Sequence, residues 1–91
     1  MDKKEFENEI IKAQNFQKLE PSRAAYWIGY ERGLGYAFYG ASFCSVAEHI
    51  TWLKQADETG DQERRMRGEG YRDGFQGKKP PALEEKFRVT S

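Results

Sequence analysis

One six-residue pattern occurs twice in this chain of 91 residues. The segment Gly29–Leu34 reads glycine, tyrosine, two charged residues, glycine and a large apolar residue, and Gly70–Phe75 repeats that order 41 residues later. Both copies lie where the flanking sequence predicts helix, and a glycine inside a helix costs about 1 kcal/mol relative to alanine. Four such glycines cost about 4 kcal/mol, a large part of a small domain's stability. Close approach of two helix backbones is the interaction that can offset this cost.

Small residues extend this pattern into a row. In a helix expected over 23–39 they recur at every fourth position, which places them on one side of the helix. A neighbouring helix can approach such a row more closely than the usual interaxial distance of roughly 8–10 Å. We therefore predict that this helix packs against a helix expected over 61–75, as two units related by a local twofold axis. The packing residues are Ala25, Gly29, Gly33 and Ala37 on the first of these helices and Gly70 and Gly74 on the second.

Capping signals predict where the helices begin. Side chains of Ser, Asp and Asn at an N-cap accept a hydrogen bond from a free backbone amide of the first turn. The expected N-caps are Asp2, Ser22, Ser45 and Asp61, and a glutamate three positions after Asp2 and Ser45 completes a capping box at each. No segment shows sustained alternation of apolar and polar residues with turn chemistry at its ends. The sequence therefore predicts an all-α protein, a compact bundle of three to four helices.

The length of the chain predicts a single helical domain over residues 1–91. Residues 1–20 are expected to form an N-terminal helix, packed on one side or extended as an arm to a second subunit. Residues 22–77 form the helical core in this interpretation, and 78–91 form a tail that is either docked or free.

Apolar residues at helical spacing predict which faces of the helices are buried. Phe6, Ile10 and Ala13 share one narrow face of the first helix. The second helix is apolar nearly all round, so we expect it at the centre of the bundle. In the third helix the stripe expected to be buried consists of Val46, Ile50 and Leu53, with Trp52 beside it.

Composition narrows the classes of function. The chain has 15 basic and 15 acidic residues, whereas nucleic-acid binders usually carry a basic excess. A single cysteine excludes an intrachain disulfide and a cysteine-based metal site, so we expect no metal and no cofactor. No stretch approaches the roughly 20 apolar residues that span a bilayer, and the first residues lack the apolar core of a signal peptide. We therefore expect a cytoplasmic protein that does not contact membranes.

The residues capable of catalysis are few. Cys44 precedes the expected N-cap of the third helix, where the helix dipole can lower a thiol pKa, and His49 follows five positions later. A cysteine nucleophile needs an oriented base beside it, and spacing alone does not establish one. The carboxylates are distributed along charged helix faces and form no recognisable acid–base pair. We therefore expect a protein that is not an enzyme.

The fourth helix carries a group of basic and aromatic residues. One interpretation is a solvated helix face whose arginines pair with nearby carboxylates, and another is phosphate contact with a ring stacked on an unpaired base. The segment Gly68–Lys79 resembles the Gly-Tyr-x-x-Gly-x-x-Gly-basic stretch of ribosome modulation factor and of many small bacterial and phage proteins. The resemblance covers about 12 residues. It implies a small helical protein on ribosomal RNA, in which Tyr71, Arg72, Lys78 and Lys79 contact RNA.

The leading hypothesis is a non-enzymatic interaction protein that docks on a larger protein or nucleoprotein complex. By analogy of size and composition it belongs with the inhibitors that phages and other mobile elements direct against host machinery, including CRISPR complexes. The alternative is a ribosome- or RNA-associated modulation factor, and either could act as a homodimer. Aromatic and arginine side chains are common in interface hot spots. The expected contact residues are Trp27, Tyr36, Trp52, Arg64, Arg67, Tyr71, Arg72, Lys78 and Lys79.

Overall fold

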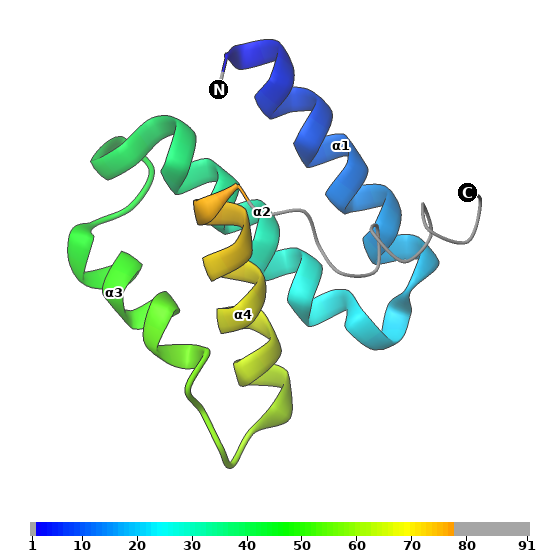
Figure 1. The fold of residues 1–91 in the computed structure, drawn as a ribbon, viewed down its shortest axis with the longest axis vertical. Coiled ribbons are helices and arrows are strands. Elements are labelled where there is room, and N and C mark those ends of the chain that lie inside the picture. The colour runs from blue at the N-terminus through cyan, green and yellow to red at the C-terminus, as the bar shows by residue number, and fades with distance from the viewer. Residues whose placement is uncertain (1, 78–91) are drawn as a thin grey trace.

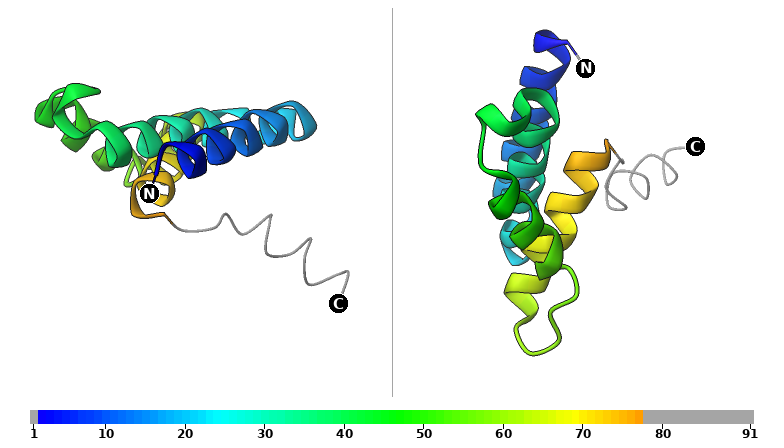
Figure 2. Two further views of the ribbon diagram at one scale, coloured as in Figure 1. Left: turned by 90° about the horizontal axis from the view of Figure 1, so that it is seen from above. Right: turned by 90° about the vertical axis from the view of Figure 1, so that its left-hand side faces the viewer.

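In the part of the chain that the structure describes, four α-helices are arranged around one central crossing (Figure 1). The computed structural model describes residues 2–77. In chain order the elements are α1 (Lys3–Leu19), the 3-10 turn η1 (Pro21–Arg23), α2 (Ala24–Tyr39), the 3-10 turn η2 (Gly40–Ser42), α3 (Val46–Gln55) and α4 (Gln62–Gln76). α2 and α4 cross at the centre, and α1 and α3 lie on opposite sides of the pair (Figure 1 and Figure 2). Within residues 2–77 there is no strand, so the expected all-α fold is confirmed.

Local chemistry explains where the helices begin and end. Side chains cap α1, α3 and α4: Asp2 accepts from the Glu5 amide at 2.8 Å, Ser45 from the Glu48 amide at 3.1 Å and Asp61 from the Arg64 amide at 3.1 Å. α2 differs from the expectation, because Pro21 starts a 3-10 turn and the N-cap is Arg23 instead of Ser22. The glycines that follow α2 and α4, Gly40 and Gly77, have positive φ angles of 62° and 71° and end these helices.

Backbone contact between α2 and α4 occurs at four glycines. A methyl group on any of them would collide with a carbonyl oxygen of the facing helix. The pairs are Gly29 with Arg67, Gly70 with Tyr26, Gly33 with Tyr71 and Gly74 with Tyr30. A shift of 41 positions turns the first pair into the second and the third into the fourth. The contacts therefore follow the local twofold axis that the repeated pattern predicts, and the two helices belong to one chain.

The same contacts offset the cost of placing glycine in a helix. Where a Cβ atom would meet the carbonyl oxygen, glycine directs a Cα hydrogen at that oxygen. Such Cα–H···O contacts contribute about 0.5–1 kcal/mol each, so four of them contribute about 2–4 kcal/mol. This is close to the cost of about 4 kcal/mol for four helical glycines.

The row of small residues on α2 is shorter than expected. Ala25 is half-buried near the start of α4, but Ala37 is exposed to solvent. The prediction that Ala37 packs against α4 is therefore wrong. Among the described residues, the close backbone contact on this row extends as far as Gly33.

The main core lies between α1 and α2. It consists of Ala13, Tyr26, Trp27, Tyr30 and Leu34, with Phe6, Ile10, Phe16 and Met66 packed against it. Two stacked ring pairs hold α1 in place, Phe6 on Phe38 at 4.6 Å and Phe16 on Trp27 at 5.0 Å between ring centroids. The predicted inner face of the first helix is confirmed, and α1 packs on its own chain.

α3 is rotated away from its expected orientation. Val46 is 55% exposed and Ile50 is 45% exposed, so the prediction that they are buried is wrong. The side of α3 that meets α4 instead carries His49 and Trp52, and Leu53 is half-buried. Rings pack on rings here because α2 and α4 present aromatic side chains to α3, and an aromatic ring buries more area than an aliphatic side chain.

One carboxylate is buried without a hydrogen-bond partner. Among the described residues, Oε1 of Glu31 on α2 is buried and accepts no hydrogen bond. Burial raises the pKa of Glu31, because the charged form loses hydration. The folded protein therefore binds this proton more tightly than the unfolded chain. The contribution of Glu31 to stability is present at acidic pH and is lost as the pH rises through the folded-state pKa.

We expect Glu31→Gln to raise the melting temperature at about pH 7 and to change it little at about pH 3, which lies below the ordinary glutamate pKa of about 4.3 and therefore also below the raised pKa of the folded state. Thermal unfolding followed by circular dichroism at both pH values measures this. Glu7→Gln, on the exposed side of α1, serves as the matched control. A variant that is less stable than the parent at neutral pH would contradict the argument.

We expect Gly33→Ala to destabilise the protein by about 3 kcal/mol, the upper part of the range for overpacked sites. The added methyl group meets the Tyr71 carbonyl and the Phe75 amide, which are backbone atoms and cannot rotate away. This outweighs the gain of about 1 kcal/mol in helix propensity. Urea unfolding gives the free energy, and Gly60→Ala is the control because only the flexible end of Glu58 lies near it.

Candidate functional site

Two of the expected contact residues are inaccessible to a partner. Trp27 is 1% exposed and Tyr71 is 0% exposed. Trp27 lies beneath α1 against Phe16, and Tyr71 lies beneath α3 against Trp52. The prediction that they bind a partner or stack on a base is therefore wrong. In each case an amphipathic helix covers the aromatic residue, which sequence periodicity on α2 and α4 does not reveal.

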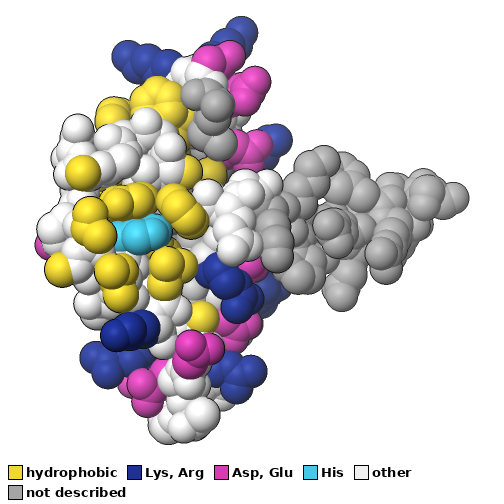
Figure 3. Space-filling view, turned by 60° about the vertical axis from the view of Figure 1, so that its left-hand side comes forward, with side chains coloured by type: hydrophobic (Ala, Val, Ile, Leu, Met, Phe, Trp, Pro, Cys, Tyr) yellow, Lys and Arg dark blue, Asp and Glu magenta, His cyan; other side chains and the backbone are white. Residues whose placement is uncertain are grey.

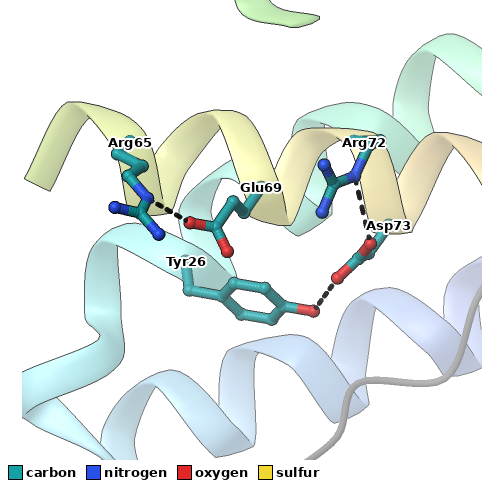
Figure 4. Close-up of polar contacts among 5 residues, drawn as sticks. All are labelled: Tyr26, Arg65, Glu69, Arg72 and Asp73. Carbon is teal, nitrogen blue, oxygen red and sulfur yellow. Dashed lines mark hydrogen bonds and ion pairs between the residues drawn. The ribbon is translucent and has the colours of Figure 1, made fainter. Parts of the chain in front are cut away.

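Carboxylates balance most of the described arginines of α4. Arg67 pairs with Glu63 at 2.8 Å and Arg65 with Glu69 at 3.0 Å, each one helical turn away. Arg72 lies 3.7 Å from Asp73, as Figure 4 shows. Arg64 is exposed and forms no ion pair within residues 2–77. Lys78 and Lys79 lie outside the described residues. Within the part of α4 that the structure describes, the basic group is thus largely a solvated face with neighbouring carboxylates.

A buried hydroxyl ties α4 to α2. The Tyr26 hydroxyl donates to the Asp73 carboxylate at 2.7 Å, as Figure 4 shows. Burial raises the pKa of Tyr26, and the hydrogen bond to Asp73 and the charge of Asp73 raise it further. The phenol therefore stays protonated and keeps its role as a donor. This contact stabilises the crossing and offers no group for chemistry.

Three aromatic rings, those of Tyr36, Tyr71 and Phe75, surround His49. Its ring stacks on Tyr36 with 3.9 Å between centroids and 9° between planes, and Phe75 contacts its face edge-on at 4.6 Å. The His49 Nδ1 atom lies 2.6 Å from the Tyr71 hydroxyl oxygen. The Trp52 ring stacks on the Tyr71 ring with 5.5 Å between centroids. The Arg32 guanidinium lies over Trp52, 5.4 Å from the centroid of its ring. Tyr36 and Trp52, both named as contact residues, are half-buried parts of this cluster.

The Tyr71 hydroxyl joins His49 to Cys44. Burial raises the pKa of Tyr71, and interactions with Cys44, including a hydrogen bond, raise it further. His49 contacts this phenol directly and Cys44 influences its pKa, and the Tyr71 side chain is sealed from solvent. Among the residues that the structure describes, no three His, Cys, Asp or Glu side chains come together as metal ligands. The arrangement anchors η2 and α3 on α4.

Four exposed apolar side chains lie at the end of α2, after η2 and on the outer side of α3. They are Tyr39 (50% exposed), Phe43 (39%), Val46 (55%) and Ile50 (45%), and we call these four residues the apolar face. In Figure 3 the only histidine of the chain is visible with hydrophobic side chains on all sides of it. Tyr39 and Phe43 stack on each other with 7° between their rings. Exposed apolar patches of this kind mark interaction surfaces.

Three of the four residues of the apolar face lie in a segment without charged residues, and Ile50 lies three positions after its end. From Gly33 to Ala47 there is no Asp, Glu, Lys or Arg, although 33% of the residues in the chain are charged. Charge depletion is characteristic of the centre of protein interfaces. This signal is readable from the sequence, but the periodicity of the third helix pointed instead to a buried stripe.

The local twofold axis supplies an internal comparison. Tyr71, Phe75 and Tyr36 surround His49, and the shift of 41 positions relates them to Tyr30, Leu34 and Gly77. These three line a hollow of about 340 Å³, whose other walls come from α1 and are polar: Glu5, Asn8, Glu9 and Lys12. In the sequence the same shift takes those α1 residues to Val46, His49, Ile50 and Leu53. The first half of the chain thus has four polar side chains where the second half has three apolar side chains and a histidine.

We expect Tyr71→Phe to lower the free energy of unfolding by about 1–3 kcal/mol, because its hydrogen bond to His49 is lost in a buried site. Urea unfolding measures the change. Tyr39→Phe removes an exposed hydroxyl from the same region and should change stability by less than about 0.5 kcal/mol. Equal effects of the two substitutions would contradict the anchoring role of Tyr71.

Comparison of the chain with protein-family models, curated proteins and solved structures gives no match in any of the three. Among the described helices, none combines the length and the apolar character needed to cross a membrane.

Proposed function

We propose that this protein is a non-enzymatic interaction protein that docks on a larger protein through the apolar face. The observation that supports this is an exposed group of two aromatic and two β-branched side chains in an uncharged stretch. An exposed helix position that contacts no partner usually carries a polar residue. Glu5 on α1, which the shift of 41 positions relates to Val46, is an example. A partner that buries the apolar face would gain the free energy of removing its side chains from water.

The support beneath the apolar face favours a specific interface. Tyr39 stacks on Phe43 and contacts Phe6 on α1, so its ring is already ordered before binding. Phe43 also lies against Gly35, where even a methyl group would collide with the ring. Rings that are ordered in advance lose less conformational entropy on binding. Docking of this kind acts by occlusion of the partner's own binding surface, as expected of an inhibitor of host machinery.

The alternative, a ribosome- or RNA-associated factor, has less support. Arg65, Arg67 and Arg72 have carboxylates within 4 Å, which reduces the attraction of this helix for phosphates. Tyr71, the ring that the resemblance to ribosome modulation factor assigns to RNA, is buried. RNA binding therefore enters the test below as a separate outcome.

A catalytic role has little support as well. Cys44 and His49 both interact with the Tyr71 hydroxyl, and this hydroxyl is closed off from any substrate by α3. A cysteine nucleophile needs a base that receives its proton directly or through an accessible group. We therefore expect Cys44→Ser to keep the activity of the protein in the capture experiment described next.

We expect Val46→Glu to abolish capture of the partner from bacterial lysate, because a carboxylate in an apolar interface is left without water and without a counter-charge. Immobilised protein and mass spectrometry identify what is bound. Ile11→Glu is the matched control, since Ile11 is 54% exposed on α1, outside the apolar face.

Each outcome of the capture experiment separates the hypotheses. A protein that is bound by the parent and by Ile11→Glu but not by Val46→Glu supports docking through the apolar face. Binding of RNA that weakens steeply between about 50 and 200 mM salt, and that survives Val46→Glu, would favour the alternative. A protein partner that is retained by Val46→Glu would overturn the role of the apolar face.

A further inference from the structure

We propose that the apolar face also binds a second copy of this chain, so that a reversible homodimer covers it when no other partner is present. The inference rests on the proposed function, because it concerns the same docking surface. A second copy of the chain and the other partner would compete for the apolar face. A partner would then bind the monomer and draw the dimer apart.

The absence of charge is what favours a second copy as the occupant. In a twofold dimer each residue near the axis meets the same residue of its partner. A charged side chain there would face its own like charge, whereas apolar side chains face each other without a penalty. No residue from Gly33 to Ala47 is charged, and this stretch contains three of the four residues of the apolar face. A heterologous partner places no such restriction on the signs of the charges.

The charge of the whole chain points the same way. Basic and acidic residues balance at 15 each, so two copies do not repel one another over long distances. A net charge near zero favours self-association in general. We expect this self-association to occur through the apolar face and to stop at the dimer.

The outer side of α3 suits packing against its own copy. Val46 and Ile50 are four residues apart and form an exposed ridge along the helix, next to the small exposed residue Ala47. Ridges with this spacing interdigitate when two helices pack, and small neighbours allow a close approach. Phe43 and Tyr39 extend the surface at one end.

The size of the surface predicts a weak dimer. Stable interfaces bury about 800 Å² per partner, which is more than four partly exposed side chains provide. The apolar face is therefore the centre of a small interface, and the dimer should dissociate on dilution. This reversibility is what makes competition with another partner feasible.

The test is sedimentation of the purified full chain between about 10 μM and 1 mM, the range in which a weak dimer forms and dissociates. We expect the average mass to rise from one chain toward two. Ile50→Glu should weaken self-association at least tenfold, because two carboxylates meet across the axis. Ile11→Glu should leave it unchanged, since Ile11 is 54% exposed on α1 and lies outside the apolar face. Circular dichroism verifies that each variant is folded.

A mixture of two variants provides the sharper measurement. Ile50→Lys should also fail to self-associate, but an equimolar mixture of Ile50→Glu and Ile50→Lys should recover association. Recovery requires that position 50 of one copy lies near position 50 of the other. No recovery, with both single variants monomeric and folded, would overturn the proposed twofold arrangement.

The outcomes for the dimer and for the docking function are distinct. A parent protein that stays monomeric at 1 mM, or an Ile50→Glu variant that still dimerises, would overturn this inference. Capture of a protein partner through the apolar face would still stand in the first case. Conversely, a dimer that is lost in Ile50→Glu, with no partner captured from lysate, supports self-association and contradicts docking on another protein.

Discussion

The contact between the α2 and α4 backbones is the constraint on which the rest of this structure depends. At Gly29, Gly33, Gly70 and Gly74 no side chain separates the helices, and carbonyl oxygens face Cα hydrogens directly. Bulky side chains cannot enter the crossing, so the aromatic residues of both helices point to its two flanks. α1 covers one flank and α3 the other.

The two flanks are built differently although the crossing is symmetric. Trp27 on α2 corresponds to Gly68 on α4 under the shift of 41 positions. Trp27 provides a large surface on which α1 packs with Phe16, whereas Gly68 lets the end of α3 touch the α4 backbone. α3 therefore supplies its own rings, His49 and Trp52, to fill the flank. Its β-branched residues then remain on the outside, and this is the physical origin of the apolar face.

Much of the fold could be predicted because its causes are local. N-cap side chains, helix-ending glycines and the repeated glycine pattern each act over a few residues, and the caps at Asp2, Ser45 and Asp61 occur where they were expected. The candidate site could not be predicted in this way. Val46, His49, Ile50 and Trp52 give α3 an apolar side in either orientation. Periodicity identifies the most hydrophobic side of a helix. It contains no information about the surface against which α3 packs.

The sequence by itself determined that the protein is all-helical and where two of the helices touch, because propensity, capping and the absence of side chains are properties of single residues and short segments. Only the tertiary structure decided which aromatic residues are sealed and which side of α3 faces water. That choice depends on the shape of the Tyr36, Tyr71 and Phe75 rings around His49, which come from two helices far apart in the chain. Packing of rings on rings outweighed the burial of Val46 and Ile50, and it left these two residues exposed.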